Sequence, residues 1–357
     1  MSIYQDDQGR SVTTNSMLSA FLRCPNQARY KYAERLKPRF ISNKDKPLKR
    51  GVWFHSLLEE YYAGRDWKAK HKELSTTFSN LFDEEKDALG DLPAEMAKLM
   101  RSYLWHYGAN KEDPFHGWEV IDTELTLEAE WPDGEGIFRG RIDLLVRDEF
   151  GLWIVDHKTH KTFPNASFRS LDTASALYTW AAWENDLPVK GFIWNYIKPK
   201  EPTKPKLVYQ DTPRERLSNS KIETDYPTYF LALKEYGLDP KEYKVVLNAL
   251  KNQRWAPDQV QMSPFFRRDI LEKNPDQIAR VLAASMKTRD KMHGYDYEDT
   301  DAVERSHNYT CEHFCKYVNL CMTELEGGNS DHIRRQSFTM GDPLDYYNET
   351  EKKKGEE

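Results

Sequence analysis

The feature that most constrains this chain is a pair of β-forming runs separated by a short turn in residues 140–161, GRIDLLVRDEFGLWIVDHKTHK. The turn, residues 148–151, begins with Asp and ends with Gly, the residue that most easily supplies the positive φ that such turns often need. The simplest antiparallel pairing across this turn sets Asp143 directly opposite Asp156. Lys158 follows Asp156 by two residues, so we expect its side chain on the same face of the sheet.

Two carboxylates in register need a physical reason, because like charges directly opposite each other destabilise a sheet. Opposed residues have Cβ atoms about 4.5–5.5 Å apart, from which both carboxylates can bind one divalent cation. Such an ion polarises a phosphodiester and lowers the pKa of an attacking water, and the ammonium group of Lys158 can offset the developing charge. On these residues alone, the alternative is an exposed hairpin with its charges on the solvated face.

The composition is that of a soluble globular protein. Of the 357 residues, 39% are hydrophobic and 31% are charged, and the chain contains 10 Trp, 20 Tyr and 16 Phe. This length allows one large domain or two of about 100–200 residues. Neither the start, MSIYQDDQGR, nor any later stretch carries the run of about 18 apolar residues that a membrane span needs. We therefore expect a cytoplasmic protein with no membrane partner.

The net charge of −6 argues against a protein that coats nucleic acid indiscriminately, because phosphate affinity comes from clustered Lys and Arg. Two segments depart from this average. Residues 35–50 hold seven basic residues and one Asp, and residues 265–270, FFRRDI, combine aromatic with basic side chains. Both are candidate contacts for a nucleic-acid strand. The first reads equally as a solvated loop, and the second as an edge strand with Arg267 and Arg268 in solvent.

Hydrophobic periodicity predicts a mixed α/β core with helical parts before and after it. Helical spacing is predicted for residues 14–36 with a break at Cys24-Pro25, and for 51–64, 93–107, 175–183, 229–250 and 275–292; strands are predicted for 119–131, 136–147, 152–159 and 190–197. We expect one domain over residues 1–325, with an insertion at about 198–270 and a polar, flexible tail at 326–357.

The four cysteines form a pattern of one residue near the start and three near the end, Cys24, Cys311, Cys315 and Cys321. In a reducing compartment four thiols rarely form disulfides. Unrelated buried cysteines are one reading, but three within eleven positions favour a metal site. Zinc sites usually show two close pairs, which this spacing lacks.

The residues RGRIDLLV followed by WIVDHKT resemble the core motif of the RecB-like branch of the PD-(D/E)xK nucleases, in which a G-x-x-D strand precedes a (D/E)-x-K strand. The resemblance implies a restriction-endonuclease-like core, a mixed central sheet flanked by helices. It also implies that Asp143 and Asp156 bind Mg²⁺ or Mn²⁺, that Lys158 is the catalytic lysine, and that the main-chain carbonyl of His157 faces the metal.

Three further positions match motifs of that branch. The segment GVWFHSLLEE resembles its helical G-x-x-x-H motif, which implies His55 as a metal ligand and suits Mn²⁺ as well as Mg²⁺. Glu124 matches the acidic residue on the strand before the metal hairpin, and Tyr178 matches the tyrosine of a Q-x-x-x-Y helix. The glutamine of that helix is Ala174 here. A lone helical His is otherwise more often packed or hydrogen-bonded than a ligand.

The cysteine set resembles the 4Fe-4S site of AddB-type helicase-nucleases and of CRISPR-associated exonucleases in the same superfamily. There the first cysteine lies in an N-terminal CP motif, as in FLRCPNQARYKY, and the triplet follows the nuclease core. Here the triplet reads C-x3-C-x5-C, whereas the family pattern has two residues in the first gap. Zinc, or a cluster of altered geometry, therefore stays open. Either would join the two ends of the domain and constrain the unfolded chain.

Together these features predict a metal-dependent DNA exonuclease that acts on single-stranded or end-containing DNA, with a helicase or recombination protein as a possible partner. The alternative is a catalytically silent DNA-binding or complex-forming subunit that keeps the fold and the cluster. An electron-transfer protein is disfavoured because it leaves the carboxylate hairpin without a role.

Overall fold

The computed structural model describes residues 3–108, 117–210, 212, 215–218, 222–252, 263–345 and 347. In this part of the chain, six strands form one mixed sheet, in the order β1-β4-β5-β6-β9, with β3 also paired to β4. The strands are β1 (Val12–Thr13), β3 (Glu119–Glu130), β4 (Ile137–Asp148), β5 (Gly151–Thr159), β6 (Val189–Ile197) and β9 (Phe266–Glu272). The predicted mixed α/β core is therefore present.

Strand β4 is the centre of the sheet. Antiparallel β3 pairs with one edge of it from Glu130–Ile137 to Glu119–Arg147. The other edge is shared by β1, which runs parallel at the start of β4, and by β5, which runs antiparallel near its end. Neither β1 nor β5 pairs with residues 139–143 in the middle of that edge. Asp143 therefore lies in the middle of β4, where its pairing partner on this edge changes.

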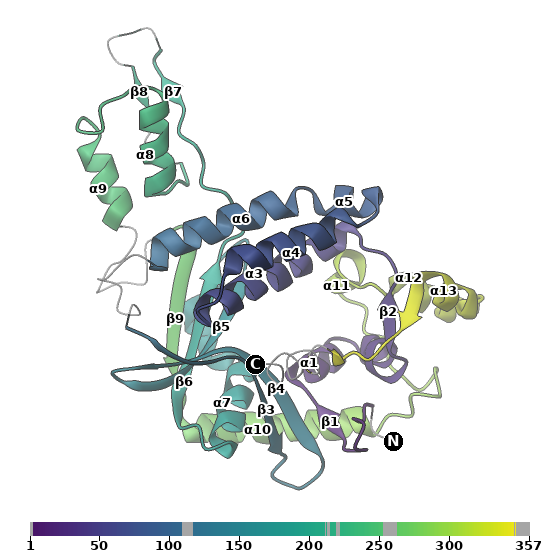
Figure 1. Ribbon diagram of the computed structural model, residues 1–357. Coiled ribbons are helices and arrows are strands. Elements are labelled where there is room, and N and C mark those ends of the chain that lie inside the picture. The colour runs from purple at the N-terminus through teal and green to yellow at the C-terminus, as the bar shows by residue number, and fades with distance from the viewer. Residues whose placement is uncertain are drawn as a thin grey trace.

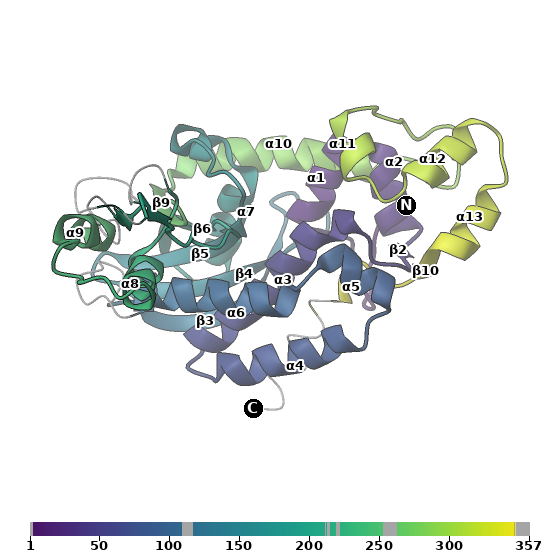
Figure 2. The ribbon, with the colours of Figure 1, turned by 90° about the horizontal axis from the view of Figure 1, so that it is seen from above.

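Helices cover the sheet on both faces (Figures 1 and 2). On one face lie α3 (Lys46–Tyr62), α4 (Trp67–Ser79), α5 (Asp83–Leu89) and α6 (Leu92–Tyr103), which enclose an apolar core with Phe54, Leu57 and Phe266. On the other lie α7 (Thr173–Glu184) and α10 (Pro275–His293), which pack with α1 (Asn15–Arg23) over Phe138, Ile154 and Trp194. Helix α7 connects the parallel strands β5 and β6, so this part is a βαβ unit.

A separate lobe lies between β6 and β9 and protrudes from the rest of the molecule in Figure 1. It contains β7 (Leu207–Val208), β8 (Arg216–Leu217), α8 (Tyr226–Glu235) and α9 (Lys244–Asn252), with its own apolar core around Tyr229, Leu233 and Leu247. Strand β9 belongs to the main sheet. The insertion thus ends before the FFRRDI segment, whereas the prediction extended it to about residue 270.

Two segments from near the ends of the chain, residues 24–38 and 309–340, meet in a second lobe, at the right of Figure 1. Helix α1 is followed by α2 (Pro25–Ala28), a π-helical turn (Arg29–Ala33) and β2 (Leu36–Pro38). These lie with α11 (Tyr309–His313), α12 (Val318–Leu325), α13 (Ser330–Ser337) and β10 (Phe338–Met340), and β10 pairs antiparallel with β2. The predicted helix break at Cys24-Pro25 is present, because Cys24 is extended at φ −165° and Pro25 begins a new helix.

The chain beyond residue 325 differs from the flexible tail expected there. Residues 330–340 form α13 and β10, and the side chains of Phe338, Leu344 and Tyr347 are buried. A few apolar residues suffice because β2 supplies the hydrogen-bonding edge for β10. Among the described residues, no helix has the length and apolar character required to cross a membrane.

We predict that Gly191→Ala lowers the free energy of unfolding by about 1–3 kcal/mol, the usual cost of overpacking. A Cβ atom at Gly191 on β6 would lie 2.2 Å from the carbonyl oxygen of Leu271 on β9, so the two backbones would have to separate. Urea denaturation measures the effect. Gly117→Ala is the control, because a Cβ there meets nothing within 4 Å; equal stability of the two variants would contradict this close approach.

Candidate active site

Strands β4 and β5 pair in the predicted register. The paired residues extend from Asp148 opposite Gly151 to Leu144 opposite Val155. The turn that sets it is closed by Asp148, whose carboxylate accepts hydrogen bonds from two backbone N–H groups of the turn at 2.8 and 3.0 Å. The two acidic residues therefore occupy the first positions beyond the paired part of the hairpin.

Three of the predicted residues converge around one point. His55 on α3, Glu124 on β3 and Asp143 on β4 each offer a ligand atom, and these atoms all lie within 4.8 Å of one another. The Nδ1 atom of His55 is 3.4 Å from Oδ1 of Asp143. One turn before His55, a Cβ atom at Gly51 would lie 3.5 Å from the hydroxyl of Thr159, so this part of α3 lies next to the end of β5.

The backbone at Glu124 departs from regular strand geometry. Its neighbours Thr123 and Leu125 pair with Leu144 and Ile142, so Glu124 faces Asp143 across the two strands. Its φ is 50°, which is uncommon for a residue with a side chain. Such strained positions cluster at functional sites. The alternating sequence pattern predicts neither the positive φ nor the burial of Glu124.

The charges of this group are strongly coupled. Burial and the nearby Asp143 carboxylate raise the pKa of Glu124 to about 7, against the effect of Arg141, whose Nε lies 2.9 Å from the Glu124 carboxylate. Burial alone would raise the pKa of Asp143, but His55 holds it well below its usual range. The net pKa shift of His55 is upward, because Asp143 outweighs the effect of burial. The pKa of each of the three groups thus depends on the charges of its neighbours in the site.

Asp156 and Lys158 form a second pair beside this group. Lys158 Nζ lies 2.8 and 2.7 Å from the two carboxylate oxygens of Asp156. Burial, opposed by Lys158, raises the pKa of Asp156 to about 6, and the Asp143 carboxylate adds to this rise. Asp156 lies outside the three-residue group defined above. The structure therefore places Asp156 next to Asp143 but turns its carboxylate toward the lysine.

His157 contacts Asp143 through its backbone and is itself held by buried side chains. Its backbone N–H donates to Oδ2 of Asp143 at 2.7 Å, and its buried ring stacks on Tyr62 with centroids 5.7 Å apart. Its Nδ1 lies 2.8 Å from Nδ2 of Asn195, which also donates to the hydroxyl of Tyr103. Burial lowers the pKa of His157 to about 3, so the ring is neutral.

The side chains that hold His157 in place were not predicted from the sequence. Asn195 lies in the middle of the apolar strand KGFIWNYI, and a lone Asn in such a strand is a signal for a buried hydrogen bond. Tyr62 and Tyr103 come from α3 and α6, so only the folded structure brings them to the same place. Arg268 is also buried here, with its guanidinium 3.7 Å from the ring centroid of Tyr107.

Tyr178 lies on α7, close to β4. Its ring packs against Gly140, where a Cβ would lie 2.5 Å from the tyrosine ring, and stacks with Phe192 at a centroid distance of 6.4 Å. A glycine at position 140 is therefore required for this helix to approach the sheet. The catalytic role that the resemblance implies for Tyr178 stays a prediction.

The four cysteines come together from the two ends of the chain. Cys24, Cys311, Cys315 and Cys321 line one pocket of about 410 Å³, along with the apolar side chains of Val318, Met322 and Leu325. Although all four lie in the described part of the chain, no three of their sulfur atoms are within 4.8 Å of one another. A tetrahedral zinc ion at about 2.3 Å from each thiolate would hold the sulfurs about 3.8 Å apart.

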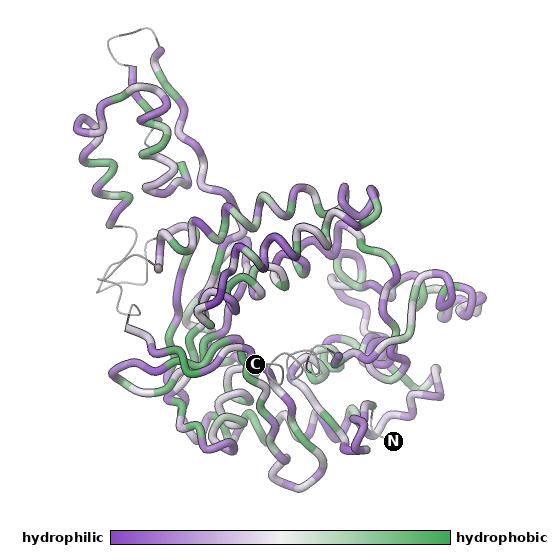
Figure 3. Tube along the Cα trace, in the orientation of Figure 1, coloured by the Kyte–Doolittle hydropathy of each residue, from purple (hydrophilic) through white to green (hydrophobic). Residues whose placement is uncertain are grey.

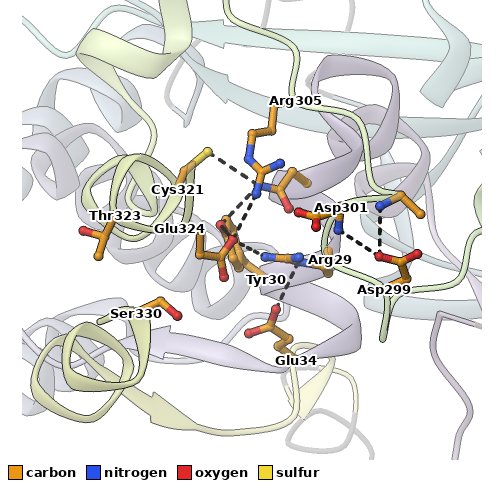
Figure 4. Close-up of polar contacts among 12 residues, drawn as sticks. Arg29, Tyr30, Glu34, Asp299, Asp301, Arg305, Cys321, Thr323, Glu324 and Ser330 are labelled. Atoms are coloured by element: carbon orange, nitrogen blue, oxygen red, sulfur yellow. Dashed lines mark hydrogen bonds and ion pairs between the residues drawn. The ribbon is translucent and has the colours of Figure 1, made fainter. Parts of the chain in front are cut away.

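Next to this pocket a buried ionic cluster joins the same two ends (Figure 4). The carboxylate of Glu324 on α12 accepts hydrogen bonds from Arg29 and from the hydroxyl of Tyr30, both at 2.5 Å. Arg334 on α13 pairs with Glu324 and with Glu34. This cluster lowers the pKa of Glu324 although burial opposes it. The lobe is thus held by charge contacts as well as by its apolar core.

Several basic side chains of residues 35–50 already have partners within the chain. Lys37 pairs with Asp345 at 2.7 Å, Arg50 pairs with Glu95, and Lys44 donates to the carbonyl of Glu312 at 3.0 Å. These contacts argue against a free strip that follows a phosphate backbone.

The FFRRDI segment is an edge strand, β9, but its arginines are not in solvent. Arg268 is buried as described above, and Arg267 lies 5.2 Å from the ring centroid of Tyr196 and donates to Asp269 at 2.8 Å. The prediction of solvent-exposed arginines at this strand is wrong, because aromatic faces and a carboxylate shield both guanidinium groups.

Comparison with known proteins gives a clear result at the level of family. A family model described as the PD-(D/E)XK nuclease superfamily matches residues 13–322. Among curated proteins none matches the sequence. Among solved structures, one described as "Crystal structure of SSO0001" is 12% identical, covers 87% of this chain and 85% of that chain, and superposes with a TM-score of 0.30. Because the family model spans most of the chain, including the hairpin and the helix of His55, the chain belongs to the PD-(D/E)XK nuclease superfamily.

Proposed function

We propose that this protein is a metal-dependent DNA exonuclease that hydrolyses phosphodiester bonds at the site formed by His55, Glu124, Asp143, Asp156 and Lys158. The superfamily implies a nuclease. The observation that carries the assignment to this site is the convergence of His55, Glu124 and Asp143 within 4.8 Å. The carboxylates suit both Mg²⁺ and Mn²⁺, and the imidazole of His55 makes Mn²⁺ as acceptable as Mg²⁺.

The residues present fit a divalent cation. Glu124 and Asp143 are acidic side chains facing each other across two strands, an arrangement that is unfavourable without a cation between them. Their positive partners here are His55 and Arg141, and Asp143 has one oxygen fixed by the N–H of His157. A bound divalent ion would lower the pKa of a water molecule and draw charge from the phosphate.

The chain's own residues account for the other requirements of hydrolysis. Lys158 keeps its ammonium charged, because Asp156 and Asp143 raise its pKa although partial loss of solvent opposes this. Its side chain is 45% exposed, so the charge remains accessible to a phosphate. His157, neutral and fixed by Asn195, holds the Asp143 carboxylate in orientation through its backbone N–H. We assign Lys158 to stabilising the charge that develops on the phosphate.

Preference for single-stranded or end-containing DNA, and action beside a helicase or recombination protein in the cytoplasm, are part of this proposal. They rest on the resemblance of the hairpin, the His55 helix and the cysteine pattern to RecB-like and AddB-type nucleases. A silent DNA-binding subunit is the alternative. The strained backbone of Glu124 favours catalysis, because a fold that only binds DNA has no use for a strained, buried carboxylate facing another.

We further propose that Cys24, Cys311, Cys315 and Cys321 bind a 4Fe-4S cluster with a structural role. The four residues line one pocket, yet their sulfurs are more widely spaced than a single zinc ion requires. A polynuclear cluster binds each thiolate at a different iron and so suits wider spacing. Asn26 donates to the sulfur of Cys321 at 3.5 Å, a contact of the kind that tunes such clusters.

Replacing Asp143 or Lys158 by Ala is expected to reduce cleavage of end-labelled DNA in Mg²⁺ or Mn²⁺ by about a hundredfold or more. The reason is loss of a metal ligand in the first case and of the charge beside the phosphate in the second. Asp87→Ala on α5 and Lys190→Ala on β6 are the matched controls and should cleave like the wild type. Equal cleavage by all five proteins would exclude this site.

Divalent-metal affinity should fall as the pH is lowered from about 8 to about 6, by up to about tenfold per pH unit. The pKa of Glu124 is about 7 and that of Asp156 about 6, both raised by burial, so protons compete with the metal below these values. Calorimetric titration with Mn²⁺ measures the dependence. Glu124→Gln should bind the ion more weakly and with a flatter pH profile; an unchanged profile would remove Glu124 from the site.

Anaerobically purified protein should contain iron and acid-labile sulfide in equal amounts and show a broad visible absorption band from thiolate-to-iron charge transfer. Cys321→Ala should lose the band and lower the unfolding temperature, because the cluster closes a loop of almost the whole chain. Stoichiometric zinc without iron would contradict the 4Fe-4S cluster and show that the cysteines bind zinc.

A further inference from the structure

Helix α3, which carries His55, is held by apolar contacts over only part of its length. Its buried side chains lie in its second half, Trp53, Phe54, Leu57 and Leu58. The preceding stretch, residues 42–52, is mostly hydrophilic (Figure 3). The structure describes every residue of this stretch, and Asp45 is the only buried one among them. The first two turns of α3 therefore depend on polar contacts for their position.

Asp45, the residue just before α3, joins two of these contacts. Its Oδ2 atom accepts hydrogen bonds from the backbone N–H and the hydroxyl of Ser42, both at 2.9 Å, and these close the turn that begins the helix. Its Oδ1 atom pairs with the ammonium group of Lys316. Because a buried carboxylate is costly without a cationic partner, this ion pair fastens the start of α3 to the segment that contains Lys316.

The partners of the start of α3 come from the segment that carries three of the cysteines. Lys316 directly follows Cys315 in the sequence. Four residues earlier, the carbonyl of Glu312 accepts a hydrogen bond from the ammonium group of Lys44 at 3.0 Å. Two contacts thus run from residues 312–316 to the residues immediately before α3.

The cysteine segment is itself fixed to the N-terminal part of the chain. The hydroxyl of Tyr317, the residue after Lys316, donates to the carbonyl of Leu36 at 2.9 Å. The ring of Tyr317 is buried and stacks on Phe338 with centroids 5.5 Å apart. Lys316 therefore extends from a rigid base, and its position is transmitted to Asp45.

The direction of α3 determines where the imidazole of His55 lies. His55 follows Asp45 by ten residues, about 15 Å along the helix, and lies about 100° around the helix from the buried Phe54. A helix held in its second half alone is free to tilt or turn, which changes the distance of 3.4 Å between His55 Nδ1 and Asp143 Oδ1. Metal ligands must be held within about 0.5 Å of their working positions. An anchor at the first turn therefore bears on metal binding.

We propose that Asp45 and Lys316 are positioning residues for the active site. Their ion pair sets the direction of α3, so that His55 meets the divalent cation together with Asp143. This inference rests on the proposed function and extends it to residues outside the site. Through this pair, the conformation of the cysteine segment acts on the affinity of the active site for its divalent cation.

The test is calorimetric titration of the anaerobically purified full-length protein with Mn²⁺. Lys316→Met keeps a long unbranched side chain but removes the charge, and it should weaken Mn²⁺ binding about threefold or more, as substitutions between coupled sites do. Lys316→Arg restores the charge and should bind Mn²⁺ like the wild type. Lys37→Met is the matched control, because it breaks the ion pair with Asp345, at 2.7 Å, that does not involve α3.

A second background distinguishes positioning of His55 from a general loss of stability. In His55→Ala, the further change Lys316→Met should leave Mn²⁺ affinity as it is, because the ion pair acts through the imidazole. An equal loss of affinity in both backgrounds would overturn the proposal. Unchanged Mn²⁺ affinity of Lys316→Met in the wild-type background would overturn it as well.

Titration of Asp143→Ala separates this proposal from the proposed function. If Asp143→Ala binds Mn²⁺ like the wild type, the metal site is misassigned and the positioning role is overturned with it. If Asp143→Ala loses Mn²⁺ binding while Lys316→Met retains it fully, the positioning role alone is overturned and the nuclease site stands.

Discussion

The candidate active site depends on one constraint, the electrostatic conflict between neighbouring carboxylates of β3, β4 and β5. Asp143 faces Glu124 on one side and adjoins Asp156 on the other, in a place where solvent screens little. Each acid has a positive partner. His55 comes from α3, which packs on the sheet, whereas Arg141 and Lys158 lie on strands β4 and β5 of the sheet itself. The position of α3, the positive φ of Glu124 and the register of β4 and β5 together bring these charges to one place.

The sequence predicted the hairpin well because its determinants are local. The Asp148 turn, the alternation of two β-forming runs and the spacing of Asp156 and Lys158 depend on neighbouring residues, and the strand register follows from them. The helix of His55 was also predicted, since its apolar stripe has the helical period. The superfamily assignment used these local motifs and is confirmed by the family match.

Features that depend on distant contacts were harder to predict. The chain after residue 325 has few apolar residues, so its pairing with β2 cannot be inferred from its own composition. The burial of Arg267 and Arg268 depends on rings from β6 and from outside the sheet, and the charged segment 35–50 has its partners as far away as Asp345. Within the site, the support of His157 by Asn195 and two tyrosines required three separate elements to fold together.

The lobe between β6 and β9 leaves and rejoins the sheet at one point. Ile197 is paired with Phe266, and the N–H of Lys198 donates to the carbonyl of Phe265 at 2.8 Å. Topologically the whole lobe is thus the loop of a hairpin, with its own core and with both connections side by side. Exchanging it for a short turn, or for an unrelated small domain, would leave every paired strand of the nuclease core in register. The fold therefore permits accessory modules to be gained or lost at this edge without rebuilding the candidate active site.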